Sequence, residues 1–170
     1  LRLAAMATNV LNLTKIENQA ILTNVSEYNL SEQIRSCVLL LENKWSKKNI
    51  VPELDFDEYY VRANEEMMKE VWINLIDNAI KYSDENGTIQ IKITETDNRI
   101  LVSVYNTGEE IPDEAKEKIF RKFYQVDESH SSEGNGIGLA IVKKVVDLHD
   151  GDVTVSSSNH KTVFTVSLPK

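Results

Sequence analysis

The chain has 170 residues and a mass of 19.3 kDa, which suits one well-packed domain with a small appendage and leaves too little room for two. Its 27 acidic and 19 basic residues give a net charge of −8, which disfavours general binding to nucleic acid or to acidic lipid. With 41% hydrophobic and 27% charged residues, the composition excludes a disordered or collagen-like chain, so we expect a packed core.

No apolar run approaches the roughly 20 residues that cross a bilayer, and no charged-then-apolar leader opens the chain, so the sequence predicts a soluble protein. The single cysteine, Cys37, has no partner for an internal disulfide, which fits a reducing compartment. We interpret it as a small buried residue on a helix. The chain begins at Leu1 within a helical pattern, which indicates a piece of a longer protein.

Residues 1–24 are predicted to form one helix of a bundle. Apolar or small residues recur with the three-four spacing of a bundle seam, at Leu3, Met6, Val10, Leu13 and Ala20. A lone helix of about 20 residues is only marginally stable in water. We therefore expect residues 1–24 to be one arm of a helical hairpin.

A second helix is expected to begin near Asn29, because Asn29 and Glu32 have the spacing of an N-terminal cap. This helix continues to Lys48, with apolar residues at helical spacing at Ile34, Cys37, Val38, Leu41 and Trp45. Pro52 lies beyond the end of the helix. Residues 54–56 and 59–61 then predict a short hairpin around Asp57 and Glu58.

Hydrophobic periodicity also predicts the elements of the remaining chain. In order, they are a helix over residues 64–82, strands around residues 89–93 and 102–104, a short helix after Pro112 that ends at Phe120 or Phe123, a mobile polar segment over residues 125–135, a helix over residues 138–148, and a hairpin over residues 153–168.

The helix over residues 64–82 carries a narrow polar stripe on an otherwise apolar cylinder. At about 100° per residue, one arc holds Glu70, Asn74, Asp77, Asn78 and Lys81. Such a stripe is also typical of a solvated helix face. Two carboxamides one turn apart favour a binding role, because amide oxygens are suitable ligands for a hard cation such as Mg²⁺.

Two glycine-containing segments add weaker signals. Gly134, Gly136 and Gly138 precede a helix, and such a run turns backbone amides toward a phosphate, although a flexible hinge has the same composition. Asn106 and Gly108 follow a strand, where a polar side chain is able to bind a base edge. By themselves these two residues indicate only a turn.

Together, in this order and spacing, the motifs resemble those of sensor histidine kinases. Residues 70–82 are similar to the N box of that family, residues 106–108 to its first glycine box, residues 120–123 to its F box, and residues 134–139 to its second glycine box. Residues 11–19 resemble the end of the second stem helix of these kinases. The wider superfamily, which includes DNA gyrase, MutL and heat-shock chaperone ATPases, usually lacks this F box and stem.

The resemblance implies an α+β fold in two layers, a mixed and mostly antiparallel sheet covered on one face by about three helices. Residues 1–27 would be the end of a dimerisation stem, and residues 28–170 the catalytic domain, with a lid over about residues 125–137. Nucleotide-binding residues implied by the resemblance are Asn74, Asn78, Lys81, Tyr82, Asn106, Gly108, Ile111, Phe120, Lys122, Phe123, Gly134, Gly136, Ile137, Gly138 and Leu139.

Catalytic roles are implied for Glu70, which would orient or deprotonate the attacking histidine, and for Asn74. Asn74 and Asn78 would hold Mg²⁺ and the phosphates of ATP, whose γ-phosphate passes to a stem histidine and, in the parent protein, to an aspartate of a response regulator. The resemblance also implies a cytoplasmic domain of a membrane-associated bacterial parent that is a homodimer. For this chain we expect a monomer or weak dimer and no nucleic-acid partner.

Two departures from the family pattern affect these expectations. The first glycine box normally opens with Asp, and here Asn106 accepts the same hydrogen bond without a charge, so we expect weaker binding of the same nucleotide. The family's phosphoacceptor motif of His, an acidic residue and a nearby Pro-Leu surrounds none of His130, His149 and His160. We expect His149 to be structural and His130 to lie in the lid. The alternative function is a nucleotide-gated interaction module, as in other ATPases of the superfamily.

Overall fold

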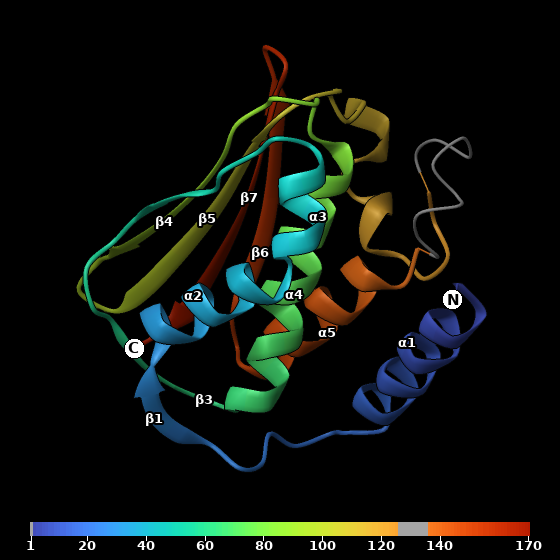
Figure 1. The fold of residues 1–170 in the computed structure, drawn as a ribbon. Coiled ribbons are helices and arrows are strands. Elements are labelled where there is room, and N and C mark those ends of the chain that lie inside the picture. The colour runs from blue at the N-terminus through green and yellow to red at the C-terminus, as the bar shows by residue number, and fades with distance from the viewer. Residues whose placement is uncertain (1, 126–135) are drawn as a thin grey trace.

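A computed structural model describes residues 2–125 and 136–170, and its ribbon is shown in Figure 1. The elements in chain order are α1 (Arg2–Glu17), β1 (Ser26–Asn29), α2 (Leu30–Leu40), α3 (Glu42–Lys47), β2 (Glu53–Asp55), β3 (Tyr60–Ala63), α4 (Glu65–Tyr82), β4 (Ile89–Glu95), β5 (Arg99–Thr107), the 3-10 turns η1 (Asp113–Ala115) and η2 (Lys118–Phe120), α5 (Gly138–Leu148), β6 (Asp152–Ser158) and β7 (Lys161–Pro169).

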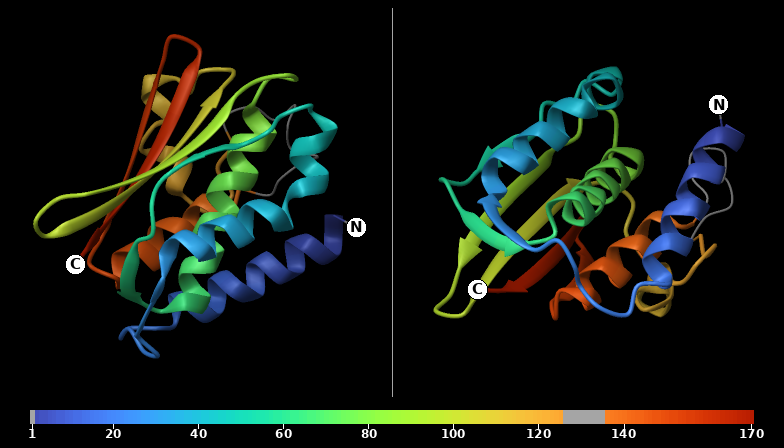
Figure 2. Two further views of the ribbon diagram at one scale, coloured as in Figure 1. Left: turned by 60° about the vertical axis from the view of Figure 1, so that its left-hand side comes forward. Right: turned by 90° about the horizontal axis from the view of Figure 1, so that it is seen from below.

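Within the described residues, five strands form a mixed sheet in the order β2-β4-β5-β7-β6. β2 runs parallel to β4, and the other neighbours pair antiparallel. α2, α4 and α5 lie on one face of this sheet, as both views in Figure 2 show. The expected α+β sandwich is therefore confirmed.

The core lies between that sheet and α4. β5 alternates throughout between buried and less buried residues, and β4 does so over residues 89–94, as the period of a half-buried strand requires. The apolar residues of α4 that face the sheet are all buried: Met68, Val71, Trp72, Leu75, Ile76, Ala79 and Ile80. This wide apolar face fixes the rotation of α4, so that its polar stripe must face away from the sheet.

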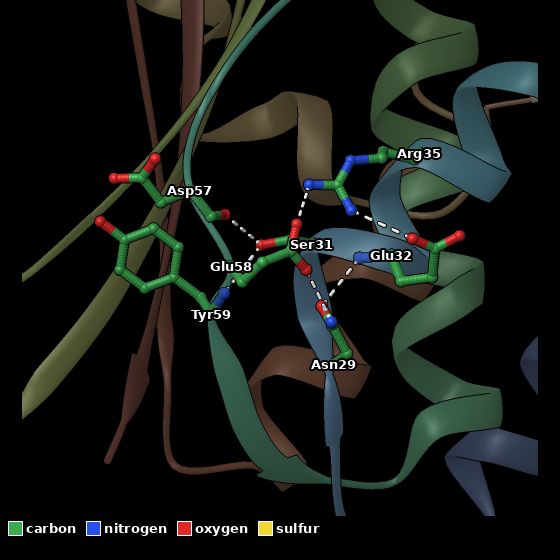
Figure 3. Close-up of polar contacts among 7 residues, drawn as sticks. All are labelled: Asn29, Ser31, Glu32, Arg35, Asp57, Glu58 and Tyr59. Atoms are coloured by element: carbon green, nitrogen blue, oxygen red, sulfur yellow. Dashed lines mark hydrogen bonds and ion pairs between the residues drawn. The ribbon is translucent and has the colours of Figure 1, made fainter.

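The N-terminus of α2 is tied to residues 57–59 by a local polar network (Figure 3). The Asn29 side chain accepts from the Glu32 amide at 3.0 Å, as the predicted cap requires, and its Nδ2 donates to Glu58 Oε2 at 2.7 Å. Ser31 Oγ donates to the Asp57 carbonyl at 2.7 Å. These bonds anchor the start of α2 to the segment that directly precedes β3.

The predicted hairpin over residues 54–56 and 59–61 is wrong. β2 pairs with β4 of the large sheet, whereas β3 pairs antiparallel with β1, a strand that the sequence did not reveal. Alternation identifies a strand but not its partner. In addition, Glu58 lacks the preference for positive φ that the second residue of a type I′ turn needs.

Three predicted helices are shorter than expected. The first ends at Glu17 and not at residue 24, because polar residues follow. The second divides at Leu41, whose φ of −101° and ψ of 12° interrupt α2 and α3. In place of the short helix predicted after Pro112, the chain forms the two 3-10 turns η1 and η2. No helix of the described residues is long and apolar enough to cross a membrane.

α1 packs beside α5 at the margin of the helical layer (Figure 2). Leu13 and Ile16 are buried in this contact, with 4% and 6% of their surface exposed. Leu11 lies on the opposite side and is 71% exposed. Leu13 of the predicted seam thus packs in the contact between α1 and α5.

Candidate functional site

α4 is fixed at its N-terminus by two side chains. Asn64 Oδ1 accepts from the Met67 amide at 3.0 Å and caps the helix. The backbone amide of Asn64 donates to His149 Nε2 at 3.0 Å, and His149 Nδ1 bonds the Val145 carbonyl at 2.8 Å. His149 is therefore a neutral imidazole that joins α4 to α5. Burial lowers its pKa, against the opposing effects of the Val145 hydrogen bond and the Asp150 carboxylate.

The predicted polar stripe of α4 is half-buried along its length. Asn74 Nδ2 donates to the Glu70 carbonyl at 2.7 Å, which fixes the orientation of the Asn74 amide. Asp77 pairs with Lys44 of α3 at 2.7 Å. The stripe is thus divided: Asp77 pairs with α3, whereas Asn74 is held by the backbone of its own helix.

The second glycine box meets the stripe at Asn74. A Cβ added to Gly138 would lie 2.7 Å from Asn74 Oδ1, so a larger residue at this position would displace the Asn74 side chain. Ile137 is fully buried and secures the same turn, and Leu139 is half-buried beside it. The N-terminus of an α-helix presents unpaired amides and a positive partial charge. The structure therefore brings the start of α5 against a carboxamide oxygen.

The first glycine box lies at the other end of α4. A Cβ added to Gly108 would lie 2.0 Å from the Tyr82 carbonyl oxygen, and Gly108 forms a bridge with Ser83. Lys81 Nζ lies 5.0 Å from the centre of the Tyr82 ring. Asn106, only 3% exposed, faces inward from β5 two residues before Gly108. Gly108 thus allows the strand end and the last turn of α4 to meet.

Two polar residues near Asn106 were missed from the sequence. Thr162 pairs with Asn106 in register and lies on the buried side of β7, and its hydroxyl is 2.8 Å from Ser157 Oγ. Ser157 Oγ in turn accepts from the Ile111 amide at 2.8 Å, which places the predicted Ile111 at this end of the sheet. The sequence did contain one signal for them: Thr162 occupies a core-facing position of β7, where the other core-facing residues are apolar.

The F-box segment contacts Gly136. The Phe123 amide donates to the Gly136 carbonyl at 2.8 Å, and both residues have positive φ, 65° and 73°. Phe120 packs against Phe164 edge to face, with ring centroids 6.2 Å apart. Phe123 itself is 58% exposed, so its ring is not part of the core.

Lys122 lies apart from the residues predicted with it. Its Nζ pairs with Glu17 Oε1 of α1 at 2.7 Å, and both side chains are partly exposed. The structure thus places this predicted nucleotide-binding cation against the stem-like helix. Gly134, His130 and most of the expected lid lie outside the described residues.

The metal prediction depends on Asn74 and Asn78. Among the described residues, no three His, Cys, Asp or Glu side chains gather into a possible metal cage. Asn74 nevertheless fits a hard cation, because its Nδ2 is occupied by the Glu70 carbonyl and its Oδ1 is turned toward Gly138. Any cation here would take its remaining ligands from a bound anion.

The other reactive side chains have structural surroundings. Cys37 is 1% exposed, and burial raises the pKa of its thiol to about 11, so the thiolate nucleophile is disfavoured. His160 is exposed and bonds Asp84 Oδ2 at 2.6 Å. Neither residue adds a nucleophile to the site.

The arrangement matches a known family. The family described as histidine kinase-, DNA gyrase B- and HSP90-like ATPase matches residues 63–170, which include both glycine boxes, the F box and α4. The chain belongs to this family. The structure of the catalytic domain of histidine kinase ThkA is 37% identical, covers 87% of this chain and 97% of that domain, and superimposes with a TM-score of 0.78.

Two longer relatives extend the similarity to α1. ThkA in complex with the response regulator protein TrrA is 34% identical over 99% of this chain and 48% of that chain, with a TM-score of 0.82. Heme sensor protein HssS of Staphylococcus aureus is 29% identical over 169 residues, which are 99% of this chain and 36% of HssS. This protein is a histidine kinase catalytic domain with ATP-binding architecture, and it spans about a third of the length of that sensor.

Proposed function

We propose that this domain binds Mg-ATP and transfers the γ-phosphate to a histidine on the dimerisation stem of a two-component sensor kinase, from which a response regulator aspartate receives it. The observation that carries the proposal is the approach of Gly138 to Asn74 Oδ1, which sets an anion-binding helix start beside a hard oxygen ligand. In the proposed complex, the phosphates lie between α4 and the start of α5.

Residues of the stripe and of the first glycine box have proposed roles. Asn74 and Asn78 hold Mg²⁺, which neutralises charge on the phosphates, and Lys81 and Tyr82 contact the phosphate chain. Asn106 accepts from the adenine amino group, and Gly108 lets the ring approach the backbone. Phosphoryl transfer needs positioning and charge neutralisation more than covalent chemistry. The apolar face of α4 supplies that rigidity.

The remaining predicted residues complete the pocket in this proposal. Gly134, Gly136, Ile137, Gly138 and Leu139 form the phosphate side, Ile111 and Phe120 support the base side, and Phe123 and Lys122 belong to the segment that leads into the lid. Lys122 exchanges Glu17 for the nucleotide only when α1 moves. Glu70, half-buried on α4, orients or deprotonates the incoming histidine.

Residues 1–27 are proposed to be the end of the stem and residues 28–170 the catalytic domain of a bacterial parent, itself a homodimer at the cytoplasmic side of the membrane. We expect this chain to be a monomer or weak dimer, because Leu13 and Ile16 of α1 are buried by contacts within the same chain. The −8 net charge supports the absence of a nucleic-acid partner.

A phosphotransfer assay tests the proposal. The protein is incubated with ATP labelled at the γ-phosphate and with a separately supplied stem that contains the phosphoacceptor histidine. Label is expected on that histidine. Glu70→Gln should retain ATP affinity while the transfer rate falls about a hundredfold or more, because general-base catalysis is lost.

The matched control is Glu66→Gln, an exposed glutamate in the first turn of the same helix, which should leave transfer unchanged. Slow release of phosphate to water without label on the stem would contradict the kinase proposal. That result would instead support a nucleotide-gated interaction module.

A further inference from the structure

The last turn of α4 is held by a lysine from outside the helix. The final carbonyls of an α-helix have no partner within it. Here Lys48 Nζ donates to the carbonyls of Ile80 at 2.8 Å, Lys81 at 2.9 Å and Ser83 at 3.0 Å. An ammonium has three N–H donors, so these three bonds use all of them.

Lys48 is itself fixed in place. It follows the last residue of α3, and its backbone amide bonds the Trp45 carbonyl at 3.2 Å. Its own carbonyl accepts from the Asn86 amide at 2.7 Å. Ile50, two residues later, is 1% exposed and anchors the segment in the core. Lys48 therefore joins a fixed segment to both sides of the turn after α4.

This turn carries groups on the phosphate side of the proposed site. It includes Lys81 and Tyr82, which contact the phosphate chain in the proposed function. Ser83 Oγ donates to the Ala79 carbonyl at 2.6 Å, a bond within the helix end itself. Among these contacts, Lys48 is the one that ties the turn to α3. The ammonium at a helix C-terminus also interacts favourably with the helix dipole.

We propose that Lys48 is a positioning residue for the phosphate half of the nucleotide site: its three hydrogen bonds hold the last turn of α4 so that Lys81 and Tyr82 face the phosphates. The proposal rests on the proposed function, since it needs a bound nucleotide. Lys48 lies behind the helix end and acts through the backbone of residues 80–83.

Two other lysines of the same segment separate positioning from charge. Lys44, one turn earlier on α3, pairs with the Asp77 side chain at 2.7 Å and not with the backbone of the helix end. Lys47 is exposed next to Lys48 in the sequence. Removing Lys47 changes the net charge by the same amount as removing Lys48. Any loss that comes only from long-range attraction of ATP therefore appears in both variants.

The experiment compares Lys48→Met, Lys48→Arg and Lys47→Met by nuclear magnetic resonance titration with ATP and with adenosine. Each titration is made at a temperature where circular dichroism shows the variant to be folded. Lys48→Met should weaken ATP binding about tenfold or more, because the last turn of α4 is no longer held where Lys81 and Tyr82 meet the phosphates. Adenosine affinity should change by less than about threefold, because adenosine lacks the phosphates.

Lys48→Arg should recover part of the ATP affinity, because a guanidinium still donates but is planar and does not reproduce the three directions of an ammonium. Lys47→Met should bind both ligands like the wild type. Equal losses for ATP and adenosine, or no loss for either, would overturn the role of Lys48.

Amide hydrogen exchange provides a readout that needs no nucleotide. Lys48→Met should accelerate exchange at Ser83 and Asn86 and leave Val71, in the buried middle of α4, unchanged. Unchanged exchange at Ser83 and Asn86 overturns the assignment of Lys48. Failure of the wild type to bind ATP overturns the proposed function instead.

Discussion

Close approach decides the residue type at two positions of the site. Gly138 and Gly108 each occupy a place where a Cβ would meet a neighbouring segment, at Asn74 Oδ1 and at the Tyr82 carbonyl. Their spacing made these glycines predictable from the sequence. Thr162, Ser157 and Lys48 were not predictable, because their importance depends on strand register and on a contact between α3 and α4.

His149 makes the stability of the protein depend on pH. Its pKa is lowered in the folded state by burial, whereas the unfolded chain protonates with an ordinary pKa of about 6.5. Above that pH both states are neutral and the contribution is fully present. As the pH falls below it, the unfolded state binds more protons, and stability falls by up to about 1.4 kcal/mol per pH unit until the folded-state pKa is reached.

Chemical denaturation at pH 7.5 and pH 5.5 measures this effect. At pH 7.5, His149→Gln should be less stable than the wild type. Its free energy of unfolding should fall less than that of the wild type between pH 7.5 and pH 5.5, because it has no imidazole to protonate. The exposed His160, replaced by Gln, provides the control for histidine titration elsewhere. An identical pH dependence in the wild type and His149→Gln would contradict the buried neutral imidazole.

At the scale of elements, sequence periodicity identified the parts of the fold that bury one regular face. α4, α5, the β4-β5 pair and the β6-β7 pair were all predicted, and the Asn29 cap of α2 is confirmed. The pairing of β3 with β1 and the parallel pairing of β2 with β4 were not, because strand partners come from distant parts of the chain. The break between α2 and α3 at Leu41 could not be predicted, because no glycine or proline lies there.

The packing of α1 predicts a local effect of mutation. Leu13 is 4% exposed against the catalytic domain, and truncating a buried leucine costs about 2–5 kcal/mol where the site cannot collapse. Because α1 contacts the domain from its margin, Leu13→Ala should release α1 before the domain unfolds. Amide exchange over residues 2–17 should rise, with little change at α4.

Leu11→Ala is the matched control, since Leu11 is on the same helix and 71% exposed. It should leave exchange in α1 nearly unchanged. The Lys122 to Glu17 ion pair is partly exposed and should add at most about 1 kcal/mol to the contact. Equal exchange in the two leucine variants would contradict the packing of α1 through Leu13.

Considered as a whole, the molecule is an acidic domain for which we propose a locally built anion site. The net charge of −8 gives no general attraction for a polyanion, so in this proposal binding comes from the start of α5, the carboxamides of α4 and a few cations. Family membership over residues 63–170 agrees with this location, since that range contains both α4 and α5.

The most direct measurement is the affinity of the protein for ATP in the presence of Mg²⁺, by calorimetric titration of the wild type, Asn78→Ala and Asn43→Ala. Asn78 lies on the polar stripe of α4, whereas Asn43 is an exposed asparagine of α3. We predict binding by the wild type and Asn43→Ala, and no detectable binding by Asn78→Ala. Unaltered ATP affinity in Asn78→Ala would contradict the assignment of the site.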